Sequence, residues 1–227
     1  MTKITEAVTA IQQIKSGQTL MVGGFGLVGA PLTLIDELTR HDADGLTIMS
    51  NNLGEPGKGL GILLRQGKVR RAIGSYFTSN REVGDAFNEG LIDLKLLPQG
   101  TFSESIRAGG AGIGGYYTRT GVDTELGKDK EVREINGERY LFEPALTADI
   151  ALVKAYKSDK LGNLIYYKTG RNFNPMMATA AKYVIAEVDE IVENGDLSTE
   201  EIVTPHLFVD AIVLSEKILT KEGVVSR

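Results

Sequence analysis

The stretch MVGGFGLVGAP, residues Met21 to Pro31, is the most informative local pattern for the fold of this sequence. Four glycines lie between the short apolar segment 18–22 and a stripe of apolar residues at helical spacing, formed by Leu34, Ile35 and Leu38. Pro31 falls where the first turn of that helix would begin. Glycines lack Cβ atoms, so the backbone can turn sharply there and leave N–H groups free to face a ligand. The stretch therefore predicts a strand, a glycine loop and a helix in succession.

The same alternation continues on both sides of this unit. Residues 4–14 have helical spacing, and helix-sized segments separate further short apolar runs at 46–50, 70–76, 92–97, 149–156, 163–167, 183–188 and 210–215. Strands that alternate with helices indicate an α/β fold with an open, mostly parallel sheet and helices on both faces. Two helix starts are predicted from capping-box spacing, at Ser79 with Glu82 and at Thr101 with Glu104.

A polar, charged segment at 118–144 interrupts the alternation. Within it, VREI and ERYLF flank Asn136-Gly137, the dipeptide typical of a tight hairpin turn. We expect an inserted β-hairpin flap at 118–144 within a single domain that spans 1–217. Residues 218–227 are expected to form a loose C-terminal tail.

Composition excludes several classes of protein. The chain has 42% hydrophobic and 24% charged residues and a net charge of −5. Its densest basic group, Lys68-Val69-Arg70-Arg71, is not a cluster of the kind that follows a phosphate backbone, which argues against nucleic-acid binding. Cysteine is absent, so disulfides and thiolate sites are excluded. No apolar run could span a bilayer and no signal peptide is recognisable, so we expect a cytoplasmic protein without membrane contact. His41 and His206 lack the spaced partners of a metal site, and no metal is expected.

Taken alone, the glycine loop is ambiguous. Gly24, Gly26 and Gly29 fit the dinucleotide spacing G-x-G-x-x-G, but the second predicted strand ends in Ser50-Asn51-Asn52 rather than in an acidic residue. The loop suits a phosphate or a polar acyl oxygen. A structural turn without a ligand explains it about as well.

Further motifs accompany the loop in a definite order: SNNLG at 50–54, LLPQGT at 96–101, IRAGGAGIGGYYTRTG at 106–121, ALVKAYKSDKLGNL at 151–164 and RNFNP at 171–175. In this order the motifs resemble those of the A (alpha) subunit of family I 3-oxoacid CoA-transferases, of the acetate, acetoacetate and succinyl-CoA type. The resemblance extends over residues 5 to 215.

The resemblance implies transfer of CoA from an acyl-CoA, succinyl-CoA or acetyl-CoA, to a short 3-oxoacid or fatty acid such as acetoacetate. A glutamate of a B subunit would carry the glutamyl-CoA thioester, so no catalytic nucleophile is expected in this chain, and two A with two B subunits would form a heterotetramer. The coenzyme A thioester is then a substrate, and no cofactor is bound permanently. The CoA would contact Gly24, Phe25, Gly26, Leu27, Val28, Gly29 and Ala30.

Three amides are candidates for substrate binding. Gln99, after Pro98, and the pair Asn51 and Asn52 each follow a predicted strand, where ligands gather in open α/β sheets. Amides can donate hydrogen bonds to a carboxylate without adding charge, so Gln99 is a candidate oxyanion or substrate contact. Turn formation explains the two asparagines equally well.

Two charged residues, Glu193 and Arg171, are further candidates for a nucleophile and an anion contact. Glu193-Asn194-Gly195 resembles the nucleophile motif of the B subunit but lacks its serine, and we interpret it as a solvated turn. Arg171 would suit a substrate carboxylate or a CoA phosphate, although a structural ion pair is the more common role of a lone arginine.

Two rival functions remain. The first is a ligand-binding or isomerase-like module of the same broad fold that acts on a sugar phosphate, because a fold does not decide a function. The second is a structural homo-oligomer of inactive subunits.

Overall fold

A computed structural model describes residues 3–220 and 223–226. Its helices are α1 (Ala7–Ile11), α2 (Leu32–Arg40), α3 (Leu60–Arg65), α4 (Arg81–Asn88), α5 (Gln99–Gly110) and α6 (Asn174–Thr179), with 3-10 turns η1 (Glu125–Gly127), η2 (Lys168–Arg171) and η3 (His206–Phe208). Its strands are β1 (Thr19–Val22), β2 (Leu46–Met49), β3 (Val69–Gly74), β4 (Asp93–Leu96), β5 (Gly115–Thr118), β6 (Val132–Ile135), β7 (Glu138–Pro144), β8 (Ala148–Asp159), β9 (Leu164–Ile165), β10 (Ala181–Val192), β11 (Ala211–Leu214), β12 (Lys217–Thr220) and β13 (Gly223–Ser226).

The main sheet has the strand order β11-β10-β8-β1-β2-β3-β4. All neighbours along this path pair in parallel, and the short β9 pairs antiparallel with β8. The predicted α/β class and the open, mostly parallel sheet are confirmed. From β1 the chain builds outward through β2, β3 and β4, and later adds β8, β10 and β11 on the other side of β1.

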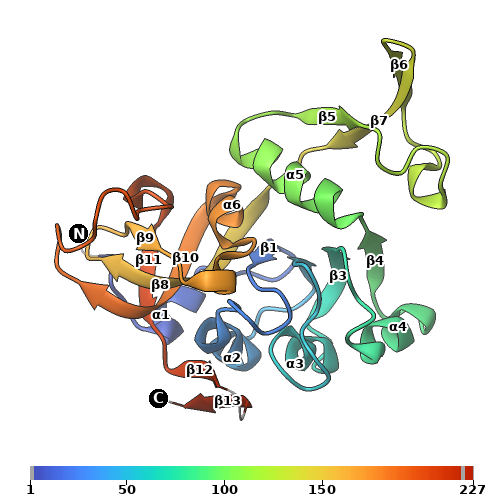
Figure 1. Ribbon diagram of the computed structural model, residues 1–227. Coiled ribbons are helices and arrows are strands. Elements are labelled where there is room, and N and C mark those ends of the chain that lie inside the picture. Colours follow the sequence, from blue (N-terminus) through green and yellow to red (C-terminus); the bar gives the residue numbers. More distant parts are fainter. Residues whose placement is uncertain (1–2, 221–222, 227) are drawn as a thin grey trace.

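Helices cover both faces of this sheet (Figure 1). Successive residues of a strand point to opposite faces, so Leu20 and Val22 pack into the core under α1, α2 and α3, whereas Met21 packs under α5 and α6. The same alternation in β2 places Ile48 on the first face and Met49 on the second. The two apolar cores hold β1 at the centre of the molecule.

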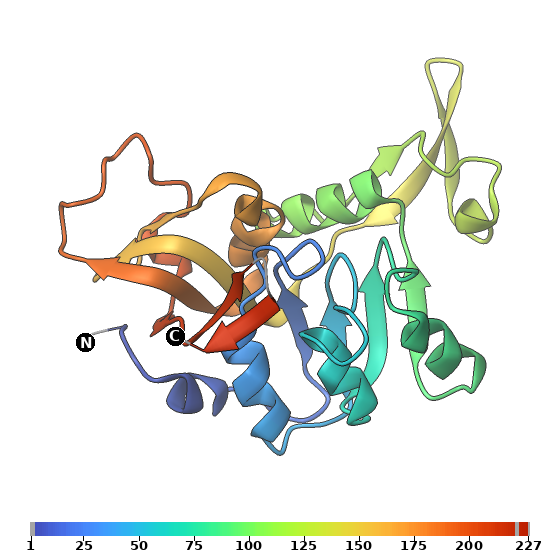
Figure 2. The same ribbon diagram turned by 60° about the horizontal axis from the view of Figure 1, so that its bottom comes forward.

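A separate three-stranded sheet, in the order β5-β7-β6, projects away from the main sheet in both views (Figures 1 and 2). The predicted turn at Asn136-Gly137 is confirmed. Ile135 pairs with Glu138, and both turn residues have positive φ, 54° and 78°. The strand β5 is not among the predicted elements; it pairs antiparallel with β7 and starts this sheet at Gly115.

The expectation of a loose tail at 218–227 is wrong for the part of it that the structure describes. β12 and β13 pair antiparallel, and they lie beside α2 in Figure 2. The backbone N–H groups of Glu216 and Lys217 each donate to Thr33 Oγ1 of α2, at 2.9 Å. These bonds attach the start of β12 to α2.

Both predicted capping boxes are wrong. Asn80 rather than Ser79 caps α4, because its side chain accepts from Glu82 N, while the Glu82 carboxylate is paired with Arg65. α5 begins at Gln99 directly after Pro98, so Thr101 lies inside the helix. Its Oγ1 is buried without a hydrogen-bond partner among the described atoms.

Candidate functional site

The glycine loop between β1 and α2 is a tight, self-bonded turn. Phe25 N donates to Val28 O at 3.0 Å and Val28 N donates to Phe25 O at 3.2 Å. Gly24, Gly26 and Gly29 have φ values of 127°, 63° and 68°, a region that favours glycine. Among the described residues, the backbone N–H groups of Gly26, Leu27 and Gly29 have no protein acceptor. The loop therefore has free donors for a ligand.

Two asparagines of the RNFNP motif form hydrogen bonds with the backbone of this loop. Asn172 Oδ1 accepts from Gly24 N at 3.1 Å, and Asn172 Nδ2 donates to Val28 O at 3.0 Å. The fully buried Asn174 donates to Gly29 O at 2.9 Å and accepts from Lys154 N at 2.8 Å. Neither asparagine was predicted, since Arg171 is the only candidate that the sequence suggests in this motif. The sequence feature that could have indicated them is the pair of asparagines, two residues apart, in a motif that accompanies the glycine-rich loop.

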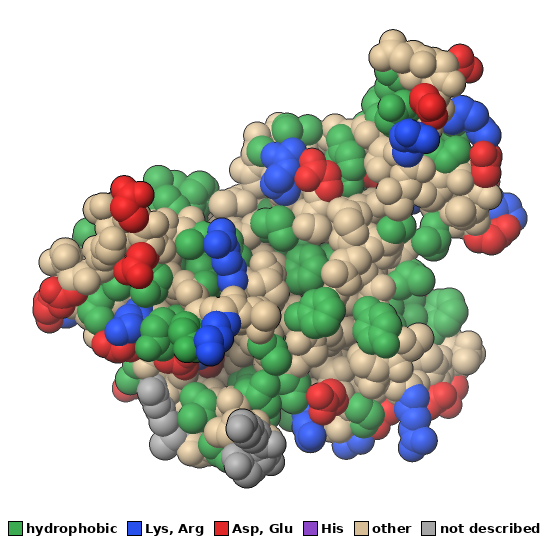
Figure 3. Space-filling model, viewed as in Figure 1, with side chains coloured by type: hydrophobic (Ala, Val, Ile, Leu, Met, Phe, Trp, Pro, Cys, Tyr) green, Lys and Arg blue, Asp and Glu red, His purple; other side chains and the backbone are tan. Residues whose placement is uncertain are grey.

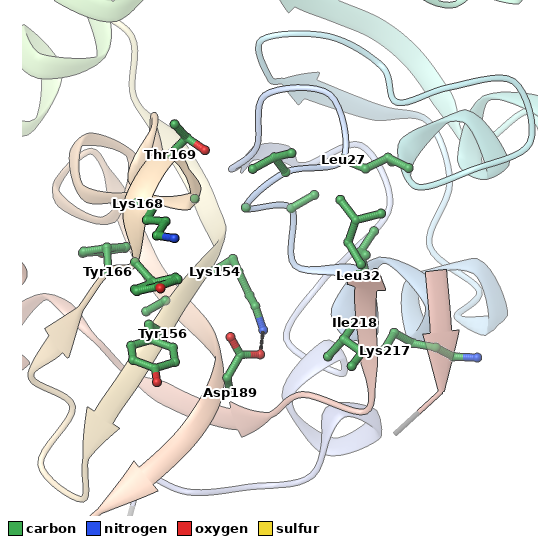
Figure 4. Close-up of a pocket in the computed structure, with 17 residues that line it drawn as sticks. Leu27, Leu32, Lys154, Tyr156, Tyr166, Lys168, Thr169, Asp189, Lys217 and Ile218 are labelled. Atoms are coloured by element: carbon green, nitrogen blue, oxygen red, sulfur yellow. Dashed lines mark hydrogen bonds and ion pairs between the residues drawn. The ribbon is translucent and has the colours of Figure 1, made fainter. Parts of the chain in front are cut away.

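A cavity of about 560 Å³ lies between the loop and β8 (Figure 4). One wall consists of the loop residues Leu27 to Ala30, followed by Leu32. The rest of the lining comes from β8, from the segment that leads through β9 into η2, from β10 and from β12: Lys154, Ala155, Tyr156, Tyr166, Tyr167, Lys168, Thr169, Gly170, Asp189, Lys217, Ile218 and Leu219.

The strand order explains why a cavity opens here. The chain leaves β1 in one direction to β2 and later returns to its other side at β8, so the connections after these two neighbours diverge. Ligands of open α/β sheets bind outside the carboxyl ends of the strands at such a switch point. The glycine loop thus occupies the position where the fold favours a ligand.

A cluster of charged residues extends from the cavity into the protein, and its members Lys154 and Asp189 line the cavity. Lys154 Nζ lies 3.3 Å from Glu187 Oε1 and 2.7 Å from Asp189 Oδ1, and it also contacts Ser215 Oγ. The second oxygen of Glu187 accepts from Thr33 N and Leu34 N at 2.9 and 3.1 Å, at the start of α2. Burial raises the pKa of Glu187, although Lys154 and these donors oppose the shift. The cluster ties β8 and β10 to the helix that follows the loop.

The three candidate amides form one hydrogen-bond network, which lies after β2 and β3 and at the start of α5. Asn51 Nδ2 donates to Ser75 Oγ at 2.8 Å and lies 3.4 Å from Gln99 Oε1, while Asn52 Nδ2 donates to Asn51 Oδ1 at 3.1 Å. Asn51 and Asn52 are buried and Gln99 is exposed. None of the three lines the cavity beside β8. Asn52 also accepts from Gly54 N, a contact that shapes its own turn.

The two charged candidates from the sequence, Glu193 and Arg171, do not line either cavity. Glu193, Asn194 and Gly195 form an exposed turn after β10, as expected. Arg171 is exposed, lines neither cavity and has no described carboxylate within ion-pair distance. Within residues 3–220 and 223–226, no group of three acidic or histidine side chains could hold a metal ion, and no helix is long and apolar enough to cross a membrane.

A second hollow of about 500 Å³ lies at the tip of the loop, lined by Phe25, Val28, Thr169 and Asn172. Phe25 and Val28 are 50% and 42% exposed, and Tyr76 beyond β3 is 54% exposed. The face seen in Figure 3 carries hydrophobic and uncharged side chains across its centre, below α5, with charged side chains mostly towards its rim. The loop tip thus presents apolar surface that a single chain leaves uncovered.

Comparison with known proteins adds to this geometry. A model of the family described as "Coenzyme A transferase" matches residues 4–215. The chain is 47% identical over 214 residues to the A subunit of the succinyl-CoA:3-ketoacid coenzyme A transferase of Helicobacter pylori strain J99, covering 94% of this chain and 92% of that protein. It is 40% identical to the alpha subunit of the acetate CoA-transferase of Escherichia coli K12, covering 95% and 98% of the two chains.

Solved structures share the fold. An acyl-CoA transferase of E. coli O157:H7, described as a thioester complex with CoA, superposes with a TM-score of 0.85 at 21% identity. This match covers 100% of the present chain, which spans only half of the other. Glutaconate coenzyme A-transferase from Acidaminococcus fermentans superposes with a TM-score of 0.82 at 19% identity, covering 94% of this chain and 75% of that one.

Proposed function

Because this chain belongs to the coenzyme A transferase family, we propose that it is the A subunit of a 3-oxoacid CoA-transferase and works together with a B subunit. One structural observation carries the proposal. The glycine loop lies at the switch point of the sheet, beside a cavity, with free backbone donors at Gly26, Leu27 and Gly29.

These donors suit thioester chemistry. When a carboxylate attacks an acyl-CoA, negative charge develops on the carbonyl oxygen, and fixed N–H groups stabilise that charge without reorganising. Asn172 and Asn174 hold the loop in place through its backbone, so the donors are oriented before the substrate arrives. In this proposal, residues Gly24 to Ala30 contact the CoA thioester.

The nucleophile comes from the partner. Asp189 is the only carboxylate among the described residues that line the cavity beside β8, and it is bound to Lys154. An acyl-glutamyl anhydride and then a glutamyl-CoA thioester would form on a glutamate of the B subunit. The apolar loop tip at Phe25 and Val28 offers surface for the B subunit to cover, and the expected assembly is an A2B2 heterotetramer.

The network of Asn51, Asn52 and Gln99 is proposed as the contact for the carboxylic acid. Gln99 is exposed at the start of α5 and can turn its amide towards a carboxylate. The buried Asn51 donates to Gln99 Oε1, and Asn52 donates in turn to Asn51. One relative is named for succinyl-CoA and a 3-ketoacid and another for acetate. We propose succinyl-CoA or acetyl-CoA as the CoA donor and acetoacetate or a similar short acid as the acceptor. We expect a cytoplasmic enzyme with no permanently bound cofactor.

A sugar-phosphate module of the same fold is not favoured. The family model and the curated relatives cited above all describe CoA-transferases, and they match along nearly the whole chain. The described residues that line the cavity also offer no pair of a free acid and a free base, because Lys154 and Asp189 bind each other.

Reconstitution tests the proposal. The chain is purified alone and together with the product of the neighbouring reading frame, and formation of acetoacetyl-CoA from succinyl-CoA and acetoacetate is followed. We expect no transfer by the chain alone and transfer by the mixture. Full activity of the isolated chain, or no activity of the mixture with any short acid, would refute the proposal.

A further inference from the structure

We propose that the edge strand β4 (Asp93–Leu96) pairs antiparallel with β4 of a second copy of this chain, so that the two main sheets join across a twofold axis at Leu94. The inference goes beyond the proposed function and does not depend on it. It concerns an edge of the sheet that β2 and β3 separate from β1 and the glycine loop.

The outer side of β4 has backbone groups without a partner strand. Among the described strands, β3 is the only neighbour of β4. Leu97 N donates to Gly74 O of β3 at 2.9 Å. Backbone groups of successive strand residues point alternately to the two sides of a strand, so those of Leu94 and Leu96 point away from β3. An edge of this kind is a template for pairing with another chain.

The opposite edge of the main sheet is already covered. Ile212 of β11 accepts from Thr5 N and donates to Lys3 O, at 2.9 and 2.8 Å. The N-terminal segment thus takes the place of a further strand beside β11, whereas no described segment does so beside β4.

The charges of β4 complement those of a second copy when the twofold axis lies at Leu94. Leu94 then faces Leu94 of the second copy, and Asp93 faces Lys95 of the second copy on both sides of the axis. Opposite charges at facing positions of two strands stabilise their pairing, and like charges destabilise it. An axis at Asp93 or at Lys95 would place two like charges opposite each other. An axis at Leu96 would place Leu94 opposite Pro98, which has no N–H to donate.

Apolar side chains on one face of this edge would be covered by the pairing. Ile92 and Leu94 pack with the core under α1, α2 and α3, and Leu96 points to the same face because strand side chains alternate. Leu96 is 48% exposed, and Leu91 and Phe87, which precede the strand, are 67% and 50% exposed. In Figure 1 β4 lies between the flap and α4, and Figure 3 shows hydrophobic side chains at the margin of the molecule there. Removing this surface from water favours association.

On the other face of the strand, Lys95 lacks a carboxylate that the second copy would supply. Among the described residues, neither Lys95 nor Asp93 forms an ion pair, and Glu143, which lies near Lys95, is bound to Lys130. Burial lowers the pKa of Lys95, Lys130 and Arg71 lower it further, and Glu143 opposes the shift. The charged lysine is therefore disfavoured in a single chain, and Asp93 of a second copy would stabilise it.

A charge-swap cycle in the purified full chain tests this register. Sedimentation equilibrium measures the dissociation constant of the dimer. Asp93→Lys and Lys95→Asp should each raise it about tenfold, because each places like charges opposite each other twice per dimer. The double variant restores opposite charges and should return to within about threefold of the wild type. The control Lys15→Asp reverses an exposed charge in the turn between α1 and β1 and should have no effect on the dissociation constant.

Disulfide trapping gives a second readout, because the chain has no cysteine of its own. At the axis, Leu94 and its copy form a hydrogen-bonded pair with Cα atoms about 5.5 Å apart, within the range that a disulfide spans. Mild oxidation of Leu94→Cys should therefore yield a covalent dimer on a non-reducing gel. The matched control is Leu214→Cys, at a 50% exposed leucine of β11 on the opposite edge, which should stay monomeric.

Three results would overturn the inference: a monomeric wild type, a dimer that both single charge reversals leave unchanged, or equal cross-linking of the two cysteine variants. A double variant as weak as the single ones would also contradict the register at Leu94. None of these measurements uses a B subunit or an acyl-CoA, so their outcome leaves the proposed function to its own test.

Discussion

Gly26 and Gly29 lie in the same loop and have similar backbone φ angles, but only Gly29 is closely packed. Substitutions at the two positions therefore distinguish the effect of backbone strain from that of steric overlap. Both have positive φ, 63° and 68°. A Cβ at Gly26 would meet nothing within 4 Å, whereas a Cβ at Gly29 would overlap Gly170 O and the Asn172 amide. The loop is thus packed against η2 at Gly29 and not at Gly26.

Alanine at these two positions should therefore have different effects. Gly26→Ala should lower the free energy of unfolding by about 1 kcal/mol, the cost of a left-handed alanine. Gly29→Ala should lower it by about 3 kcal/mol, because the overlap adds to that cost, and should reduce kcat/KM about a hundredfold by displacing the donors. Urea unfolding and steady-state kinetics of the complex measure both effects. Equal losses in the two variants would contradict the packing described here.

At this scale, the sequence predicts where special residues lie better than what they touch. Strand ends and turn chemistry point to the glycines, Asn51, Asn52 and Gln99, and the structure joins the three amides in one network. Asn172 and Asn174 escape prediction because their contacts span about 145 residues of chain. No local pattern encodes such a distance.

Glu187 links two elements, because it lies on β10 and accepts from the first N–H groups of α2. Burial raises its folded pKa above the unfolded value of about 4.5. The protonated form is then favoured by folding, so its contribution to stability is complete below about pH 4.5 and is lost as pH rises through the folded pKa.

The corresponding variant is Glu187→Gln, which cannot titrate. The difference in free energy of unfolding, wild type minus variant, should decrease as pH rises above about 4.5, through the raised pKa of Glu187. Urea titrations at a series of pH values measure this difference. A difference that increases with pH would mean that Lys154 and the helix donors outweigh burial, and that the pKa of Glu187 is lowered instead.

The flap is an element that should respond independently of the core. Gly137 has a φ of 78° in the turn of the β6–β7 hairpin, and this hairpin belongs to a sheet separate from the main one. Gly137→Ala should therefore speed amide hydrogen exchange in β6 and β7 and leave exchange in β1 and β2 unchanged. Faster exchange in β1 as well would show that flap and core unfold together.

Element ends are harder to predict than elements. Both capping boxes miss the true start of their helix, because Asn80 is the better placed acceptor and because α5 already begins after Pro98. The C-terminal hairpin escapes prediction since its docking depends on Thr33 Oγ1, far away in the chain. Turn chemistry at Asn136-Gly137 is local, and there the prediction is confirmed.

For the whole molecule, alternation of strands and helices is enough to predict a parallel sheet covered on both faces. It cannot predict the order β11-β10-β8-β1-β2-β3-β4, which depends on the pairing of distant strands. That order places the glycine loop beside β8 and creates the cavity. The fold class thus follows from local patterns, whereas the shape of the site requires the topology.

The proposal that the nucleophilic glutamate belongs to the B subunit is tested most directly by locating the covalent intermediate. The complex of this chain with its B subunit is incubated with succinyl-CoA, the enzyme-bound thioester is reduced with borohydride, and both chains are mapped by peptide mass spectrometry. The modification should appear on one glutamate of the B subunit and on no carboxylate of this chain. A reduced glutamate in this chain, at Glu193 or elsewhere, would contradict the proposal that this chain supplies the loop and not the nucleophile.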